Sequence, residues 1–127
     1  MAQAGQPVWL YRYAYVFQGM RGRDMGTRHG CEIPFAFNVP DAIQPLAQGI
    51  PNFAVTPSDR QMADLTSGYW AQFGKTGNPN GGGRPMWEQH NPAVDRLMQF
   101  TNSGITAGTD PLKQRLDLWQ QVWERSR

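Results

Sequence analysis

The chain has 127 residues, enough for one domain with a modest core. Its net charge of +2 is too small to indicate a nucleic-acid surface, and no stretch reaches the ~20 apolar residues of a membrane span. A single cysteine, Cys31, excludes an internal disulfide and a cysteine-built zinc site, so we expect neither a metal nor a cofactor. The first residues lack the features of a signal peptide, which favours a cytoplasmic location for the chain as given.

The first ordered segment is an aromatic strand, VWLYRYAYVF, at residues 8–17. Apolar side chains alternate on both of its faces, which predicts a strand inside a covered sheet and not at a half-exposed edge. Glycines and prolines then interrupt the chain. We expect a loop over residues 19–30, a short turn-like segment at CEIPFAFN, and an extended surface loop over residues 38–57.

A helix with clear boundary signals follows at TPSD. Thr56 is predicted to be its N-cap, Pro57 its first residue and Asp59 the acid of a capping box. Apolar side chains recur at helical spacing beyond this point, and Gly74 or Gly77 is predicted to end the helix.

The last third of the chain predicts a short strand, RLMQFT, and a second helix. This helix is expected to be capped by Asp110, with Pro111 as its first residue. Four side chains at helical spacing predict a buried stripe that packs on the core or on a missing part of the domain: Leu112, Leu116, Trp119 and Trp123. The intervening GNPNGGGRP lacks the G-K-[ST] of a phosphate loop, so we interpret it as a turn.

These elements do not complete a sheet. A strand of about ten residues inside a sheet needs hydrogen-bond partners on both edges, because each unpaired buried backbone group costs about 1–3 kcal/mol. The only other strand candidate is short. The sequence therefore predicts a part of a larger sheet protein.

Two motifs indicate which larger protein this is. The first is HGCEIPFAF at residues 29–37, and the second is WAQFGKTGNPN at residues 70–80. In this order, after an aromatic strand and before PMW, they resemble the C-terminal part of the type-B carboxylesterases. That α/β-hydrolase family includes para-nitrobenzyl esterase and the cholinesterases.

The resemblance implies an α/β fold in which residues 1–127 are a single C-terminal segment of an esterase domain. We expect one major core strand, a histidine loop, two amphipathic helices and a short second strand, which are incomplete as a stand-alone domain. The expected partner of this segment is the remainder of the esterase domain, which would lie in the same chain or in a separate one. The substrate of the complete enzyme would be a small-molecule carboxylic ester.

The resemblance also implies a role for His29 as the catalytic base of a Ser-Glu/Asp-His triad. Gly30 and Glu32 would hold the loop in position. The chain contains no G-x-S-x-G motif, and the acid of the triad would also precede it. The chain is therefore expected to lack esterase activity by itself, although its parent protein would be an enzyme.

Other interpretations remain beside this one. A Cys31 nucleophile is disfavoured, because residues two apart in extended chain point to opposite sides. His90 is interpreted as a surface turn residue, and a stacking surface for RNA is disfavoured by the low charge. The alternative function is a non-catalytic binding or self-association module derived from an esterase, in which exposed aromatic side chains pair with a partner.

Overall fold

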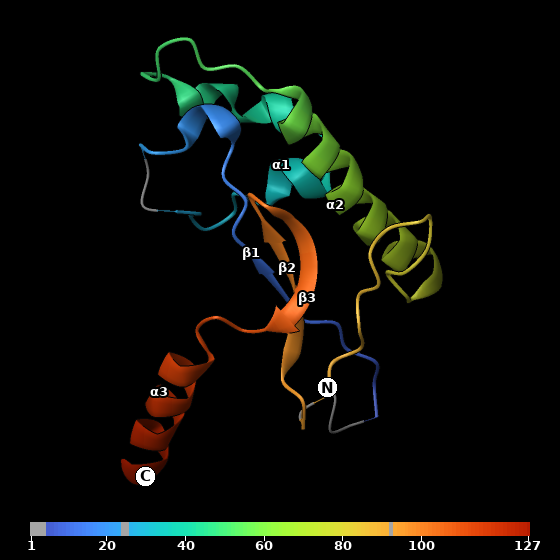
Figure 1. The fold of residues 1–127 in the computed structure, drawn as a ribbon, viewed down its shortest axis with the longest axis vertical. Helices are drawn as coiled ribbons and strands as arrows, with labels where there is room; N and C mark the ends of the chain where they lie inside the picture. The colour runs from blue at the N-terminus through green and yellow to red at the C-terminus, as the bar shows by residue number, and fades with distance from the viewer. Residues whose placement is uncertain (1–4, 24–25, 92) are drawn as a thin grey trace.

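A computed structural model of the protein describes residues 5–23, 26–91 and 93–127. A small sheet lies beside a long helix, and a second helix extends away from both (Figure 1). The strands are β1 (Tyr11–Tyr13), β2 (Arg96–Thr101) and β3 (Gly104–Thr109). The helices are α1 (Ile33–Ala36), α2 (Pro57–Thr76) and α3 (Lys113–Arg125), with 3-10 helices η2 (Gln18–Met20) and η3 (Pro40–Ala47). No helix in the described ranges is both long and apolar enough to cross a membrane.

The sheet is mixed, with strand order β1-β2-β3. β1 runs parallel to β2, with Tyr11 opposite Met98, so the segment between these strands crosses over with α1 and α2. β2 and β3 form an antiparallel hairpin. The predicted strand RLMQFT is confirmed as β2, whereas β3 was not predicted.

The predicted strand at residues 8–17 is in the right place but much too long. Only three of its residues form the ladder, and flanking bonds from Met98 N to the Leu10 carbonyl and from Ala14 N to the Phe100 carbonyl extend the pairing slightly. Beyond Ala14 the chain leaves the sheet. Within the described residues β1 also has a strand on one side only, so a second neighbour, which its predicted position inside a sheet requires, is not supplied by these residues and stays a prediction for the larger domain.

The core lies between the sheet, α1 and α2. Phe35, Tyr69, Met98 and Phe100 are completely buried. The Phe100 ring meets the edges of several aromatic rings, including Tyr69 at 5.8 Å between centroids. Aromatic packing between β2 and α2 thus fixes the helix on one face of the sheet.

α2 follows its boundary signals closely. The Thr56 side chain accepts a hydrogen bond from Asp59 N, the Asp59 carboxylate accepts one from Thr56 N, and Pro57 is the first helical residue. Gly77 ends the helix in the left-handed conformation, with φ +73°. The predicted N-cap Thr56 and the predicted first residue Pro57 are therefore confirmed, and of the two predicted ends the helix uses Gly77.

The segments predicted as irregular contain short helices. CEIPFAFN includes the four-residue helix α1, and the predicted loop over residues 38–57 contains η3. In the predicted loop over residues 19–30 the structure has the end of η2 and several turns, and residues 24–25 lie outside the described part.

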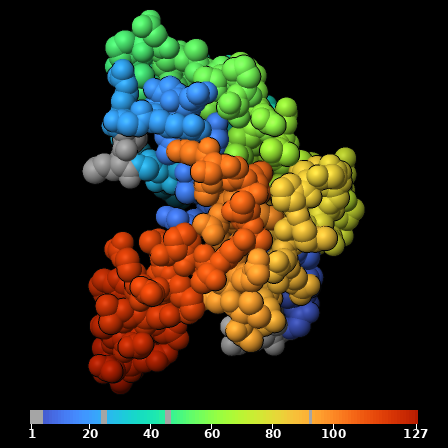
Figure 2. All heavy atoms as spheres, viewed as in Figure 1, coloured from blue at the N-terminus to red at the C-terminus, as the bar shows by residue number. Residues whose placement is uncertain are grey.

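α3 differs most from its prediction. It begins at Lys113, two residues after Pro111, and Asp110 Oδ1 accepts a hydrogen bond from Leu112 N just before the helix. The predicted stripe does not pack on the core of this chain, because Leu116, Trp119 and Trp123 are 52%, 69% and 61% exposed. Its predicted alternative, a contact with a missing part of the domain, stays a prediction. Figure 2 shows α3 as a lobe that projects from the rest of the molecule.

Candidate active site

The loop that carries His29 is fixed at both ends. Before it, Thr27 Oγ1 donates a hydrogen bond of 3.1 Å to the backbone carbonyl of Tyr13 in β1. After it, Gly30 adopts φ +77°, and its carbonyl accepts a hydrogen bond from Ile33 N at the start of α1. A left-handed residue is easiest for glycine, so the sequence HG places a sharp turn directly after the histidine.

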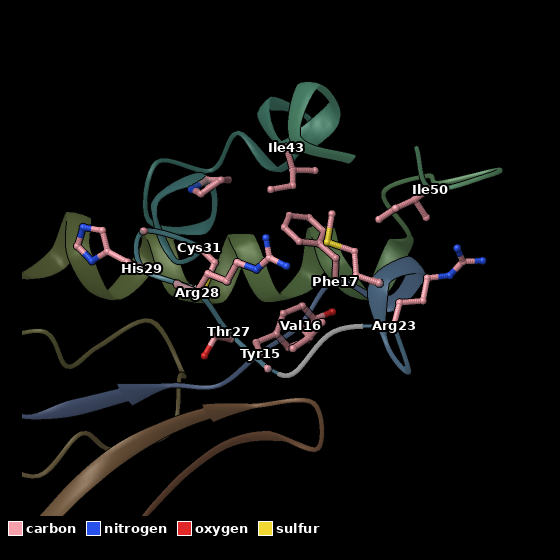
Figure 3. A pocket seen from close by; sticks show the side chains of 14 residues that line it. Tyr15, Val16, Phe17, Arg23, Thr27, Arg28, His29, Cys31, Ile43 and Ile50 are labelled. Atoms are coloured by element: carbon pink, nitrogen blue, oxygen red, sulfur yellow. Dashed lines mark hydrogen bonds between the residues drawn. The ribbon is translucent and has the colours of Figure 1, made fainter. Parts of the chain in front are cut away.

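His29 lies at the rim of an open hollow of about 730 Å³. The close view shows the histidine at one end of this hollow and Arg23 at the other, with Ile43 and Ile50 above (Figure 3). The imidazole is exposed. An exposed imidazole beside an apolar hollow can exchange a proton with a group that enters the hollow.

The rest of the hollow is largely apolar. Its lining includes the buried rings of Tyr15 and Phe17, which follow β1, together with Met20, Pro34, Ile43 and Ile50. The residues from Tyr15 to Met20 and from Thr27 to Cys31 form two sides of it. No serine lies among its lining residues in the described part of the chain.

Asp59 joins the segment that follows β1 to the start of α2. Its buried carboxylate accepts hydrogen bonds from Tyr15 Oη at 2.7 Å and Gln18 N at 3.0 Å on one oxygen, and from Thr56 N and Thr56 Oγ1 at 2.8 Å on the other. Burial and the Asp59 carboxylate raise the pKa of Tyr15 well above its ordinary value. The capping-box signal predicted the helix contacts of Asp59 but not its bonds to Tyr15 and Gln18.

Glu32 occupies the N-cap position of α1, although its side chain makes no capping hydrogen bond. It is half-buried and does not line the hollow. Its negative charge helps to raise the pKa of Tyr11 and Tyr13 in β1, after the larger effect of burial. The structure therefore brings His29 and Gly30 to the hollow and leaves Glu32 on the side toward β1.

Cys31 does not resemble an activated nucleophile. Its half-buried thiol donates to the carbonyl of Arg28 at 2.6 Å. Burial, followed by the charge of Glu32, raises its pKa, which lowers the thiolate fraction. The described residues contain no group of three or more His, Cys, Asp and Glu side chains arranged for a metal ion.

His90 differs from the prediction of a surface turn residue. It is half-buried, and its backbone N donates to the carbonyl of Val8 at 2.7 Å. Neither His90 nor the aromatic residues around it line the hollow at His29. The two histidines of the chain therefore occupy different environments.

What the sequence did not reveal is the wall of the hollow. Tyr15 and Phe17 were placed in a continuous strand, and Ile43 and Ile50 in an irregular loop. The spacing of Tyr15 and Phe17 indicated a buried face, but no local signal marked the point at which the chain leaves the sheet. Only the tertiary positions of η3, which contains Ile43, and of the turn after it, which contains Ile50, bring the two isoleucines to the hollow.

The chain is similar to known proteins in sequence and in fold. The model of the carboxylesterase family matches residues 1–119. The chain is 37% identical to carboxylesterase 4A of Bos taurus over 121 residues, covering 94% of the chain, and 30% identical to carboxylesterase 3B of Mus musculus over 133 residues, covering 98%. Among solved structures, a thermophilic PNB esterase matches 86% of the chain with a TM-score of 0.71 and 25% identity. The carboxylesterase EST55 of Geobacillus stearothermophilus matches 94% with a TM-score of 0.66 and 24% identity.

The fold is thus that of part of an α/β-hydrolase esterase. More narrowly, the chain belongs to the carboxylesterase family. It spans 20% and 22% of the length of the two named relatives, and 21% and 23% of the two solved structures. The predicted family membership is confirmed, and the match to about a fifth of each relative agrees with a partial domain.

Proposed function

We propose that this chain is the C-terminal part of an ester-hydrolysing domain and that His29 is its general base. The observation that carries the proposal is the position of His29: an exposed imidazole, on a loop fixed by Thr27 and Gly30, at the rim of an apolar hollow. Membership of the carboxylesterase family supports carboxylic esters as the substrate class.

In this proposal neutral His29 takes the proton of a serine hydroxyl as its oxygen attacks the ester carbonyl. The imidazolium then gives the proton to the leaving alcohol, and the same exchange with water releases the acid. The serine and the acid that orients His29 are supplied by chain outside residues 1–127. Gly30 and Glu32 act only by holding the loop.

The isolated chain is expected to be inert for a physical reason. An imidazole without an oriented nucleophile and without donors for the developing oxyanion provides little stabilisation of the transition state. The outer edge of β1 supports the same view, since among the described residues no strand lies beside it. We propose that the remainder of the esterase domain pairs with this edge, in the same chain or in a separate one.

A chimeric enzyme tests the role of His29. This chain would replace the matching part of Geobacillus stearothermophilus carboxylesterase EST55, and hydrolysis of short-chain nitrophenyl esters would be measured. We expect an active chimera that loses about a thousandfold or more of its kcat on His29→Ala. The 127-residue chain alone should show no activity above the buffer.

The second histidine provides a matched control. His90→Ala in the same chimera should change kcat by less than about tenfold, because His90 lies away from the hollow. Thermal unfolding of each chimera separates loss of chemistry from loss of folding. A folded His29→Ala chimera with unchanged kcat would remove His29 from the mechanism.

The alternative function, a binding or self-association module, rests on α3. Its exposed apolar side chains include Leu116, Trp119 and Trp123 on one stripe, with Val122 beside the stripe and Leu118 farther round the helix. Such a face on a projecting helix is unusual for a monomer in water. Either the remainder of the domain or a second copy would cover it.

A further inference from the structure

One edge of β1 pairs with β2, and the backbone groups on its other edge can be assigned. In a strand, successive residues direct their backbone N–H and C=O groups to opposite edges. The carbonyl of Leu10 and the N–H of Ala14 bond to β2, so the even-numbered residues face β2. Trp9, Tyr11 and Tyr13 therefore direct their backbone groups to the edge at which no described strand lies.

This open edge ends at Tyr13. The Tyr13 carbonyl, which points away from β2, already accepts the hydrogen bond of 3.1 Å from Thr27 Oγ1. No hydrogen bond among the described residues uses the backbone groups of Trp9 or Tyr11 at this edge. The backbone groups of Trp9 and Tyr11 are therefore available to a further strand, and Thr27 occupies the position directly after them.

A second hollow, of about 270 Å³, lies beside this stretch of the edge. Its walls include Trp9 and Tyr11 from the edge and Trp70 and Phe73 from α2, and none of its lining residues in the described part of the chain is charged. The rings of Trp9 and Phe73 meet edge to face at 5.8 Å, and Phe73 is still 50% exposed. The indole N–H of Trp9 is buried without an acceptor among the described residues. The hollow therefore fits an apolar group that arrives together with a hydrogen-bond acceptor.

An added strand fits the edge and the hollow together. Neighbouring strands lie about 5 Å apart, so a strand beside Trp9 and Tyr11 would place its side chains on the α2 face at the hollow. The same strand would bring backbone carbonyls. The described residues supply no such strand, and the chain spans 23% of the length of EST55, so most of the esterase domain lies outside it.

We propose that a strand from the remainder of the esterase domain bonds to the backbone of Trp9 and Tyr11 and places an apolar side chain in the hollow beside Phe73. The inference rests on the proposed function for the identity of the partner, and it adds the surface that the partner occupies. In strand addition the backbone hydrogen bonds give affinity and the pocket selects the side chain. Because Thr27 closes the edge two residues before His29, the pairing stops where the His29 loop meets the sheet.

Amide exchange, measured residue by residue in the EST55 chimera and in the 127-residue chain, tests the edge. In the isolated chain the Tyr11 amide should exchange at least about a hundredfold faster than the Ala14 amide, because only Ala14 N bonds to β2. In the chimera the two rates should agree within about tenfold, since both amides are then bonded. A Tyr11 amide that still exchanges about a hundredfold faster than Ala14 in the folded chimera would overturn the proposal.

The hollow is tested by placing one charge at two positions of α2. Phe73→Asp puts a carboxylate into the hollow, whereas Ala71→Asp puts it at an exposed position on the other side of the helix. In the chimera Phe73→Asp should speed the exchange of the Tyr11 amide by at least about tenfold, because a carboxylate resists burial against an apolar side chain. Ala71→Asp should change it by less than about twofold. Equal effects of both substitutions would overturn the proposal, and Phe73→Ser takes the place of Phe73→Asp if that chimera does not fold.

The remaining outcomes separate this inference from its alternatives. A Tyr11 amide that exchanges slowly in the concentrated isolated chain and fast after dilution would assign the edge to a second copy of the chain, which would overturn the proposal. A slowly exchanging Tyr11 amide in a chimera whose activity survives His29→Ala would support the docking and contradict only the proposed catalytic role. A chimera that depends on His29 but has a fast Tyr11 amide would contradict only the docking.

Discussion

Asp59 shows how one side chain can serve a helix and a loop together. Its carboxylate closes the N-terminus of α2 through Thr56 and also accepts hydrogen bonds from Tyr15 and Gln18, where the chain leaves β1. A carboxylate can accept at both oxygens, and this one is completely buried. The position of Tyr15, which lines the hollow, thus depends on Asp59, and the sequence signal of Asp59 is only that of a capping box.

Asp59→Asn should destabilise the chain by about 2–3 kcal/mol, because the amide nitrogen would face donors and leave two of them unpaired. Urea unfolding followed by tryptophan fluorescence measures the change. Tyr15→Phe is the matched variant, since it removes a single donor and should cost about 1 kcal/mol. Equal and small losses for both substitutions would show that the four hydrogen bonds are not all formed in solution.

Gly30→Ala should destabilise the chain by about 1 kcal/mol and disturb the His29 loop. The added Cβ would meet only Ile33 Cδ1 at 3.4 Å, which is ordinary contact, so the penalty comes from φ +77°. Gly74→Ala is a control of opposite sign. Gly74 lies inside α2 with open space around it, and alanine there should stabilise the chain by about 0.5–1 kcal/mol. Urea midpoints of the two variants on the same side of the wild type would contradict this.

At the scale of elements, the sequence predicted helices better than strands. The boundaries of α2 depend on local chemistry at Thr56, Pro57 and Gly77, which the sequence displays directly. The length of β1 depends instead on where partner strand β2 ends, and that information lies more than 80 residues away. β3 was missed because GITAGT has little apolar character, although the glycine at its start (φ +124° at Gly104) is a hairpin signal.

The burial of α3 could not be deduced from its own periodicity. The helical spacing of Leu116, Trp119 and Trp123 was recognised, but spacing identifies an apolar face without identifying what covers it. In the described structure the face is exposed. The pattern therefore indicates a contact that residues 1–127 do not make within themselves.

Self-association through α3 is the corresponding prediction. At micromolar concentration the chain should sediment as more than a monomer, because covering two tryptophans and a leucine removes a large apolar surface from water. Trp119→Lys, in the stripe, should shift the population toward monomer. Gln121→Lys, on the opposite side of the helix, adds the same charge and should have no effect. Monomers at all concentrations, or equal effects of both lysines, would contradict the prediction.

For the molecule as a whole, the sequence indicated His29 as a candidate base and identified the family of the chain, but it did not indicate the surroundings of the candidate site. His29 was found because a glycine, a carboxylate and an aromatic anchor follow it in a fixed order. The wall of the hollow could not be found in this way, because Phe17 and Ile43 come together only through tertiary packing, in which η3 lies against α1 and α2. Local motifs predict a candidate for the reacting group, and tertiary packing decides what surrounds it.

The tyrosines set the response of the whole fold to alkaline pH. Burial raises the pKa of Tyr13, Tyr15 and Tyr69 above the ordinary value of about 10. Above that pH the unfolded chain releases phenolic protons that the folded chain retains. The folded state then binds more protons, so its stability falls as the pH rises. Below about pH 10 both states hold these protons, and the three groups contribute no pH dependence.

We therefore expect the urea midpoint to fall slightly above about pH 8.5, where the unfolded chain loses the Cys31 proton that the folded chain retains, and to fall steeply above about pH 10. Each of the three tyrosines removes up to about 1.4 kcal/mol per pH unit in that range. Tyr15→Phe should make the fall shallower by one such contribution, whatever it does to the stability at neutral pH. Tyrosinate absorbance should rise together with unfolding, because the buried phenols ionise only when they become exposed. Ionisation of all four tyrosines at about pH 10 in the folded chain would show that these rings are not buried in solution.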